Sequence, residues 1–124
     1  MKAFFWISVG AIFGANLRYW VGRWAARVLG VGFPYGTLII NITGSLILGF
    51  FLVWTTERVV ADAKWRLLIA VGFCGAYTTF STYTFETMAL LQQGQWKLSL
   101  WNVVSSNLIG LCAVLAGMTL ARSI

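Results

Sequence analysis

The stretch GFCGAYTTFSTYTFE, residues 72–86, decides the fold because it places polar groups in the middle of an apolar segment. That segment, about residues 65–92, exceeds the roughly 20 residues that cross a bilayer as a helix. Glycine and β-branched threonine weaken a helix. Helix interruptions at membrane depth occur only where the backbone is buried in protein or lines a cavity. The stretch therefore predicts a membrane helix that is broken at its centre.

The composition of the whole chain is that of a membrane protein. Of its 124 residues, 60% are hydrophobic and 10% are charged, against about 45–50% and about 25% in soluble domains. A soluble domain of this size could not bury so much apolar surface. We expect one all-α integral membrane domain over residues 1–124. Its four transmembrane helices are predicted at about residues 3–28, 35–56, 65–92 and 98–121.

The charges point to a lipid bilayer as the partner and give no clear orientation in it. Nine Lys and Arg against three Asp and Glu give a net charge of +6, and basic residues flank membrane spans, so we expect no nucleic acid. Four spans put both termini and the 57–64 loop on one side. That side carries Lys2, Arg58, Lys64, Arg66 and Arg122. The other side carries Arg18, Arg23, Arg27 and Lys97. Five against four indicates either that both orientations insert, so that opposed copies pair, or that finer signals set one orientation.

The residues needed for most enzyme chemistry are missing from the sequence. There is no histidine, only three acids, and no nucleophile–base set. Cys74 and Cys112 lie far apart in apolar sequence without a second ligand nearby, which is typical of packing residues. We therefore expect no enzyme activity.

Small residues at helical spacing predict closely packed helices. Gly10, Gly14 and Gly22 follow a four-residue step in the first span, and Ser45 and Gly49 repeat that step in the second. Small residues at such spacings let helix backbones approach each other in membranes.

Polar side chains inside the spans need partners. Thr37 and Asn41 share one helix face, and the Asn41 amide either joins two helices or lines a polar path. Phe80 and Tyr83 also share a face, and positive ring edges can face an anion without a formal charge. Arg18 either reaches the interface or faces a vestibule. A polar strip near the start of the fourth span holds Asn102, Ser105, Ser106 and Asn107. These polar, mostly uncharged groups suit the passage of a small anion. Conduction requires that the ion bind weakly enough to leave the site again.

Three strings together resemble the Fluc (CrcB) fluoride channel family over essentially the full chain. They are GAIFGANLRY at residues 10–19, GTLIINITGSLILG at 36–49 and the stretch 72–86. The resemblance implies a fluoride-selective channel for passive, electrogenic export that lowers cytoplasmic fluoride. It also implies a multi-pass protein of the bacterial inner membrane that works as an antiparallel, dual-topology homodimer.

The resemblance also implies roles for individual residues. Backbone carbonyls of Gly75 and Thr78 would hold a structural Na+ on the dimer axis. The predicted ion pathway comprises Thr37, Asn41, Phe80, Ser81, Thr82, Tyr83, Ser106 and Asn107. Arg18 matches the family's first-span arginine and Glu86 its glutamate. At position 83 the family usually has phenylalanine. The added hydroxyl can donate to fluoride or hold the ion longer, so we expect permeation to persist at an altered rate.

Two other functions fit parts of the sequence. A small multidrug-resistance type cation exporter shares the length, four spans and dual topology, but needs a membrane-embedded acid that the first span lacks. In a non-transporting assembly subunit, the polar residues would only join helices, and no ion flux would be measured.

Overall fold

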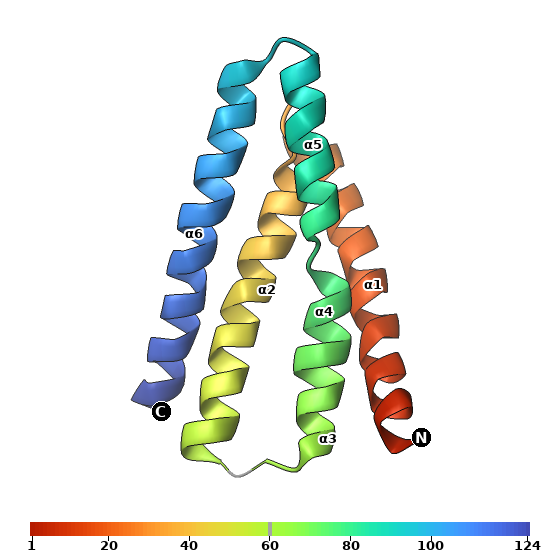
Figure 1. Cartoon of the computed structure of the whole chain (residues 1–124), viewed down its shortest axis with the longest axis vertical. Helices are drawn as coiled ribbons and strands as arrows, with labels where there is room; N and C mark the ends of the chain where they lie inside the picture. The colour runs from red at the N-terminus through yellow and green to blue at the C-terminus, as the bar shows by residue number, and fades with distance from the viewer. Residues whose placement is uncertain (60) are drawn as a thin grey trace.

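The computed structural model describes residues 1–59 and 61–124, and this part of the chain is helical without strands (Figure 1). Helix α1 spans Lys2–Leu29, and α2 (Tyr35–Val53) continues into the π-helical turn η1 (Trp54–Arg58). The third helix is interrupted. Its first part runs without a gap through α3 (Ala63–Trp65), η2 (Arg66–Cys74) and α4 (Gly75–Tyr77), and its second part is α5 (Phe80–Gln92). Helix α6 spans Trp96–Ser123. The prediction of an all-α chain with a broken third helix is confirmed.

The helices stand roughly side by side, with α2 between α6 and the interrupted helix (Figure 1). The most extensive packing joins α2 to α6 and α1 to η2. The N-terminus, the C-terminus and the start of α3 lie at one end of the molecule (Figure 1). The turns that follow α1 and α5 lie at the other end. Each of these turns contains a glycine with positive φ, Gly30 at 84° and Gly94 at 75°, a conformation that other residues adopt only at a cost.

Close contacts between α1 and η2 depend on glycine. A Cβ atom on Gly10 would collide with the carbonyl of Leu68, and one on Gly14 with the carbonyl of Phe73. Gly72 faces α1 in the same way. Gly22 has open space where its Cβ would be. Its backbone is nevertheless approached by α2, since a Cβ on Gly36 would lie 3.1 Å from the Gly22 Cα. The expected close packing is therefore confirmed at all three glycines of the repeat.

Glycines also allow α2 and α6 to pack closely. A Cβ on Gly49 would meet the Val114 backbone, and one on Gly117 would meet the backbone of Leu46. At the end of these helices, Arg122 forms two hydrogen bonds of 3.0 Å with the Glu57 carboxylate. This exposed pair joins η1 to the end of α6.

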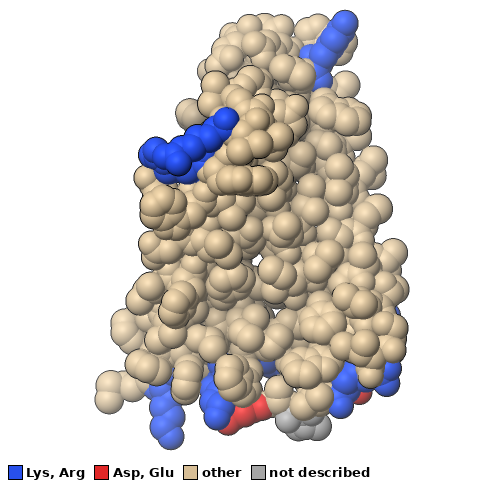
Figure 2. All heavy atoms as spheres, turned by 180° about the vertical axis from the view of Figure 1, so that it is seen from behind, with Lys and Arg blue, Asp and Glu red and all other residues tan. Residues whose placement is uncertain are grey.

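The outer surface is dominated by apolar side chains. Phe4, Phe80 and Phe85 are each more than 70% exposed. On the face shown in Figure 2, Lys and Arg lie toward the two ends of the molecule, with a broad uncharged band between them. By length and composition, two helices are suited to cross a membrane, Tyr35–Arg58 and Trp96–Ser123. Exposed apolar surface on this scale is expected where lipid or another chain covers a protein.

The interruption of the third helix lies at Thr78 and Thr79. Both have extended backbone, with φ −79° and ψ 157° at Thr78 and φ −151° and ψ 116° at Thr79. The neighbouring glycines, Gly72 and Gly75, lie within helical segments. The break therefore lies at the two threonines in the middle of the segment, as the sequence predicted, while Gly72 packs closely against α1.

Tyr77 anchors the last turn before the break. Its side chain is 4% exposed, and its hydroxyl lies 2.8 Å from the Thr43 hydroxyl on α2. Thr43 donates its own proton to the Ile39 carbonyl, so Tyr77 is the donor in this bond. It joins α4 to α2 beside the point where the helix stops.

We expect Tyr77→Phe to lower the free energy of unfolding by about 1 kcal/mol, the net worth of one such hydrogen bond. The measurement is the midpoint of thermal unfolding in detergent. Tyr35→Phe is the control, because no protein group in the described chain bonds the hydroxyl of Tyr35 and its side chain is 39% exposed. Equal midpoints for the Tyr77 variant and the wild type would contradict this account.

Candidate ion pathway

Asn41 pairs with the backbone of the break. Its Nδ2 donates to the Thr79 carbonyl at 3.0 Å, and the Thr79 N–H donates to its Oδ1 at 2.8 Å. Thr79 is 8% exposed, so its backbone groups would be costly to leave unpaired. One side chain thus satisfies both peptide groups of Thr79. Asn41 joins two helices, as one of the two interpretations of its sequence position required.

Two backbone carbonyls at the break lose their helical partners. In a continuous helix the Gly75 carbonyl would accept from the N–H of Thr79, which here bonds Asn41. The Thr78 carbonyl would accept from the N–H of Thr82, which instead bonds the Thr79 hydroxyl at 3.2 Å. No backbone N–H in residues 1–59 and 61–124 donates to either carbonyl. The two carbonyl oxygens at the break, which we predicted as cation ligands, are therefore free to accept a further partner.

A cavity of about 270 Å³, which we call the lateral cavity, lies between α2, the break, α5 and α6. It is lined by Asn41, Gly44, Ser45, Leu48, Thr78, Thr79, Phe80, Tyr83, Ser106 and Asn107. Five predicted pathway residues meet here from three helices. The rings of Phe80 and Tyr83 lie 5.7 Å apart between centroids and are tilted by 48°. No charged side chain lines the cavity.

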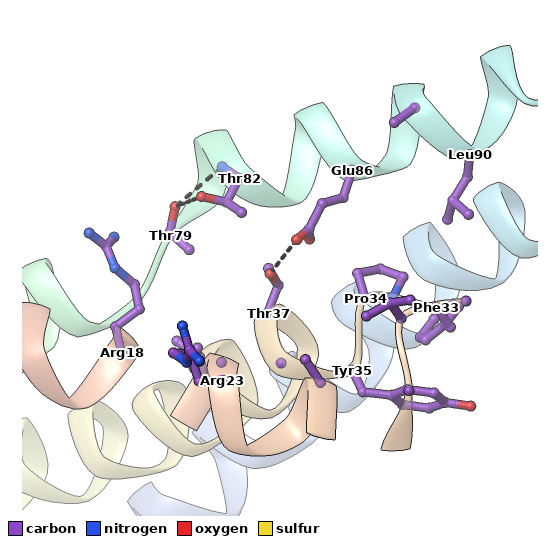
Figure 3. Close-up of a pocket in the computed structure, with 18 of the residues that line it drawn as sticks. Arg18, Arg23, Phe33, Pro34, Tyr35, Thr37, Thr79, Thr82, Glu86 and Leu90 are labelled. Carbon is purple, nitrogen blue, oxygen red and sulfur yellow. Dashed lines mark hydrogen bonds between the residues drawn. The ribbon is translucent and has the colours of Figure 1, made fainter. Parts of the chain in front are cut away.

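A second cavity of about 580 Å³, which we call the vestibule, adjoins the lateral cavity at Thr79. The α1 residues Arg18 and Arg23 line it together with Thr37, Thr82 and Glu86 (Figure 3). Thr79 lines both cavities. The structure thus places Arg18 at the vestibule, one of the two locations left open by its sequence position.

Thr37 and Glu86 both line the vestibule, and their side chains point toward each other (Figure 3). The Thr37 hydroxyl donates to Glu86 Oε1 at 2.9 Å, and Glu86 Oε2 is buried without a protein partner. Ser81 lines neither cavity; its hydroxyl lies 3.4 Å from that of Thr79. Of the predicted pathway residues, it is the one that the structure leaves outside both cavities.

The polar strip of α6 divides into two groups. Asn102 is 2% exposed and donates to the Thr87 hydroxyl at 2.9 Å, and Ser99 donates to the Thr87 carbonyl. These bonds join α6 to α5. Ser106 and Asn107 instead reach the lateral cavity. Helical spacing alone did not separate the two groups.

Sequence reasoning missed the roles of Thr79 and Arg23. Thr79 caps α5 by accepting from the N–H of Thr82, and threonine three residues before such an N–H is a recognisable helix-start signal. Arg23 gave no such signal, because basic residues near a span end are ordinary at a membrane interface.

The fold and its two cavities define a small helical membrane protein with polar cavities on either side of a broken helix. The chain belongs to the CrcB family, since the family model described as "CrcB-like protein, Camphor Resistance (CrcB)" matches residues 5–118. Three similar proteins are each named fluoride-specific ion channel FluC. The one from Koribacter versatilis is 56% identical over 100% of this chain and 98% of its own length. The Sulfurihydrogenibium protein is 42% identical over 98% of each chain, and the Roseiflexus protein 47% over 94% of each. The resemblance found in the sequence motifs is confirmed.

Proposed function

We propose that this protein is a fluoride-selective ion channel that conducts fluoride passively and electrogenically. The observation that carries the proposal is the lateral cavity, whose walls offer ring edges, amides and hydroxyls and no charged side chain. Such groups can replace the water around a small anion without trapping it. The names of the similar proteins agree with this function.

The proposed route runs from the vestibule to the lateral cavity. Arg18 and Arg23 raise the local anion concentration in the vestibule. The anion then passes the wall formed by Asn41 and Thr79 and meets the ring edges beyond it. Among the other predicted pathway residues, Thr37 and Thr82 line the vestibule and Ser106 and Asn107 line the lateral cavity, whereas Ser81 lies outside both.

The free carbonyls at the break support a proposed structural Na+. Unwound backbone carbonyls coordinate Na+ in membrane proteins, and Gly75 is exposed with open space around its Cα. One chain supplies two such oxygens, from Gly75 and Thr78. A two-fold axis through this point would supply four. A bound Na+ would hold two broken helices together at the centre of an antiparallel homodimer.

The proposed location is the bacterial inner membrane, crossed four times by each copy. The uncharged band of Figure 2 would face lipid or the second copy. The near-balance of basic residues at the two ends agrees with copies that insert in opposite orientations. Passive flux out of the cell would lower cytoplasmic fluoride.

Fluoride efflux from liposomes tests the function. Purified protein is reconstituted in liposomes loaded with potassium fluoride, and release is followed with a fluoride electrode. We expect fast release that requires a potassium ionophore to compensate charge, while chloride in parallel liposomes stays inside. No fluoride release from folded, reconstituted protein would contradict the proposal and favour a non-transporting membrane subunit.

A further inference from the structure

We propose that the Tyr83 hydroxyl is a hydrogen-bond donor to the anion in the lateral cavity, and that Asn107 is the positioning residue that orients it. The proposal rests on the proposed fluoride channel function. It assigns the binding strength of this site to a pair of residues on two helices, 24 positions apart in the sequence.

The orientation of the Asn107 amide is set by its own helix. Its Nδ2 donates to the Val103 carbonyl at 2.8 Å. A carbonyl oxygen only accepts, so the atom next to it must be the amide nitrogen and not the amide oxygen. The hydrogen-bond network therefore decides between the two ways in which the amide could be placed.

The same nitrogen lies 3.2 Å from the Tyr83 hydroxyl oxygen. An amide nitrogen donates and does not accept, so Tyr83 is the acceptor in this bond. Its own proton is then free, and within the described chain no acceptor takes it. Tyr83 lines the lateral cavity, so an anion there is a suitable acceptor.

Two of the other hydroxyls around the cavity donate their protons elsewhere. Ser106 donates to the Asn102 amide oxygen at 3.4 Å, and Thr78 donates to the Cys74 carbonyl at 2.8 Å. One N–H of the Asn41 amide donates to the Thr79 carbonyl, and its second N–H is still available as a donor. The Tyr83 hydroxyl and the Asn41 amide thus offer donors to the cavity from different helices.

A donor at this place favours fluoride over larger halides. Hydrogen bonds to an ionised acceptor are shorter and roughly twice as strong as neutral ones. Among halides, fluoride concentrates its charge in the smallest radius and accepts the strongest bonds. The pair therefore strengthens binding of the ion that is hardest to dehydrate.

The test is a double-mutant cycle with Tyr83→Phe, Asn107→Leu and the combined variant. The measured quantity is the fluoride concentration that gives half-maximal conductance in planar bilayers. We expect it to rise about tenfold in Tyr83→Phe, the worth of one bond to a charged group. Asn107→Leu should raise it about threefold, because a phenol without its partner can turn away. Since Asn107 acts through the hydroxyl, the combined variant should equal Tyr83→Phe alone.

Asn16→Leu is the matched control. Asn16 also donates to the carbonyl four residues before it, at 2.7 Å, and lies in neither cavity. We expect its half-maximal concentration to stay at the wild-type value. Asn107→Ala provides a second truncation if the leucine variant does not fold, as judged by gel filtration and circular dichroism.

Two results would overturn the proposal. One is a Tyr83→Phe channel with the wild-type half-maximal concentration. The other is an Asn107 variant that shifts this concentration by the same factor whether residue 83 is Tyr or Phe, which would show a structural role. Absence of fluoride current in the wild type would instead reject the channel function itself, so the two failures are distinguishable.

Discussion

Replacing Gly10 by valine is expected to prevent the protein from folding. A side chain at this position would meet the Leu68 carbonyl and the Phe73 backbone in the third helix. Backbone atoms of a packed helix cannot move aside as the end of a flexible side chain can. We expect the free energy of unfolding to fall by about 4 kcal/mol or more, as it does for severe core substitutions. Such a loss approaches the whole stability of many domains.

The measurement is the yield of monodisperse protein in gel filtration after extraction in detergent. Gly22→Ala is the matched control, because a Cβ there meets nothing within 4 Å and alanine favours helix over glycine. Its yield should equal or exceed that of the wild type. A Gly10→Val protein with wild-type yield and thermal midpoint would show that α1 and η2 do not pack as described.

Replacing Asn41 by leucine is expected to lower stability and to abolish fluoride flux. The change leaves the N–H and the carbonyl of Thr79 without partners at a buried site. Each unpaired group costs about 1–3 kcal/mol, and the wall between the two cavities loses its fixed shape. Thermal unfolding and liposome efflux measure the two effects separately.

Asn41→Asp tests the effect of charge at this position. The carboxylate still accepts from the N–H of Thr79 but cannot donate to the Thr79 carbonyl, so the thermal midpoint should also fall. A negative charge beside the route should in addition stop the anion. Asn16→Leu again serves as the control with unchanged midpoint and flux. Wild-type flux in both Asn41 variants would remove this residue from the pathway.

Much of the candidate site could be read from local sequence. The break followed from glycines and threonines within one apolar segment, because helix weakness is a property of neighbouring residues. Its position at Thr78 and Thr79 agrees with the predicted break at the centre of residues 65–92. The proposed cation ligands Gly75 and Thr78 were named from the family resemblance, and the structure shows that their carbonyls receive no backbone hydrogen bond.

The sequence by itself determined the membrane-protein character, the helical class and the family, because composition, span length and motifs are local properties of the chain. Only the tertiary structure decided that Asn41 holds Thr79, that Asn102 packs against Thr87, and that Asn107 meets Tyr83. Helical periodicity shows which residues share a face but not which neighbour that face meets. That choice depends on how closely the helices approach, and here the approach is set by glycines whose backbones touch carbonyls of another helix.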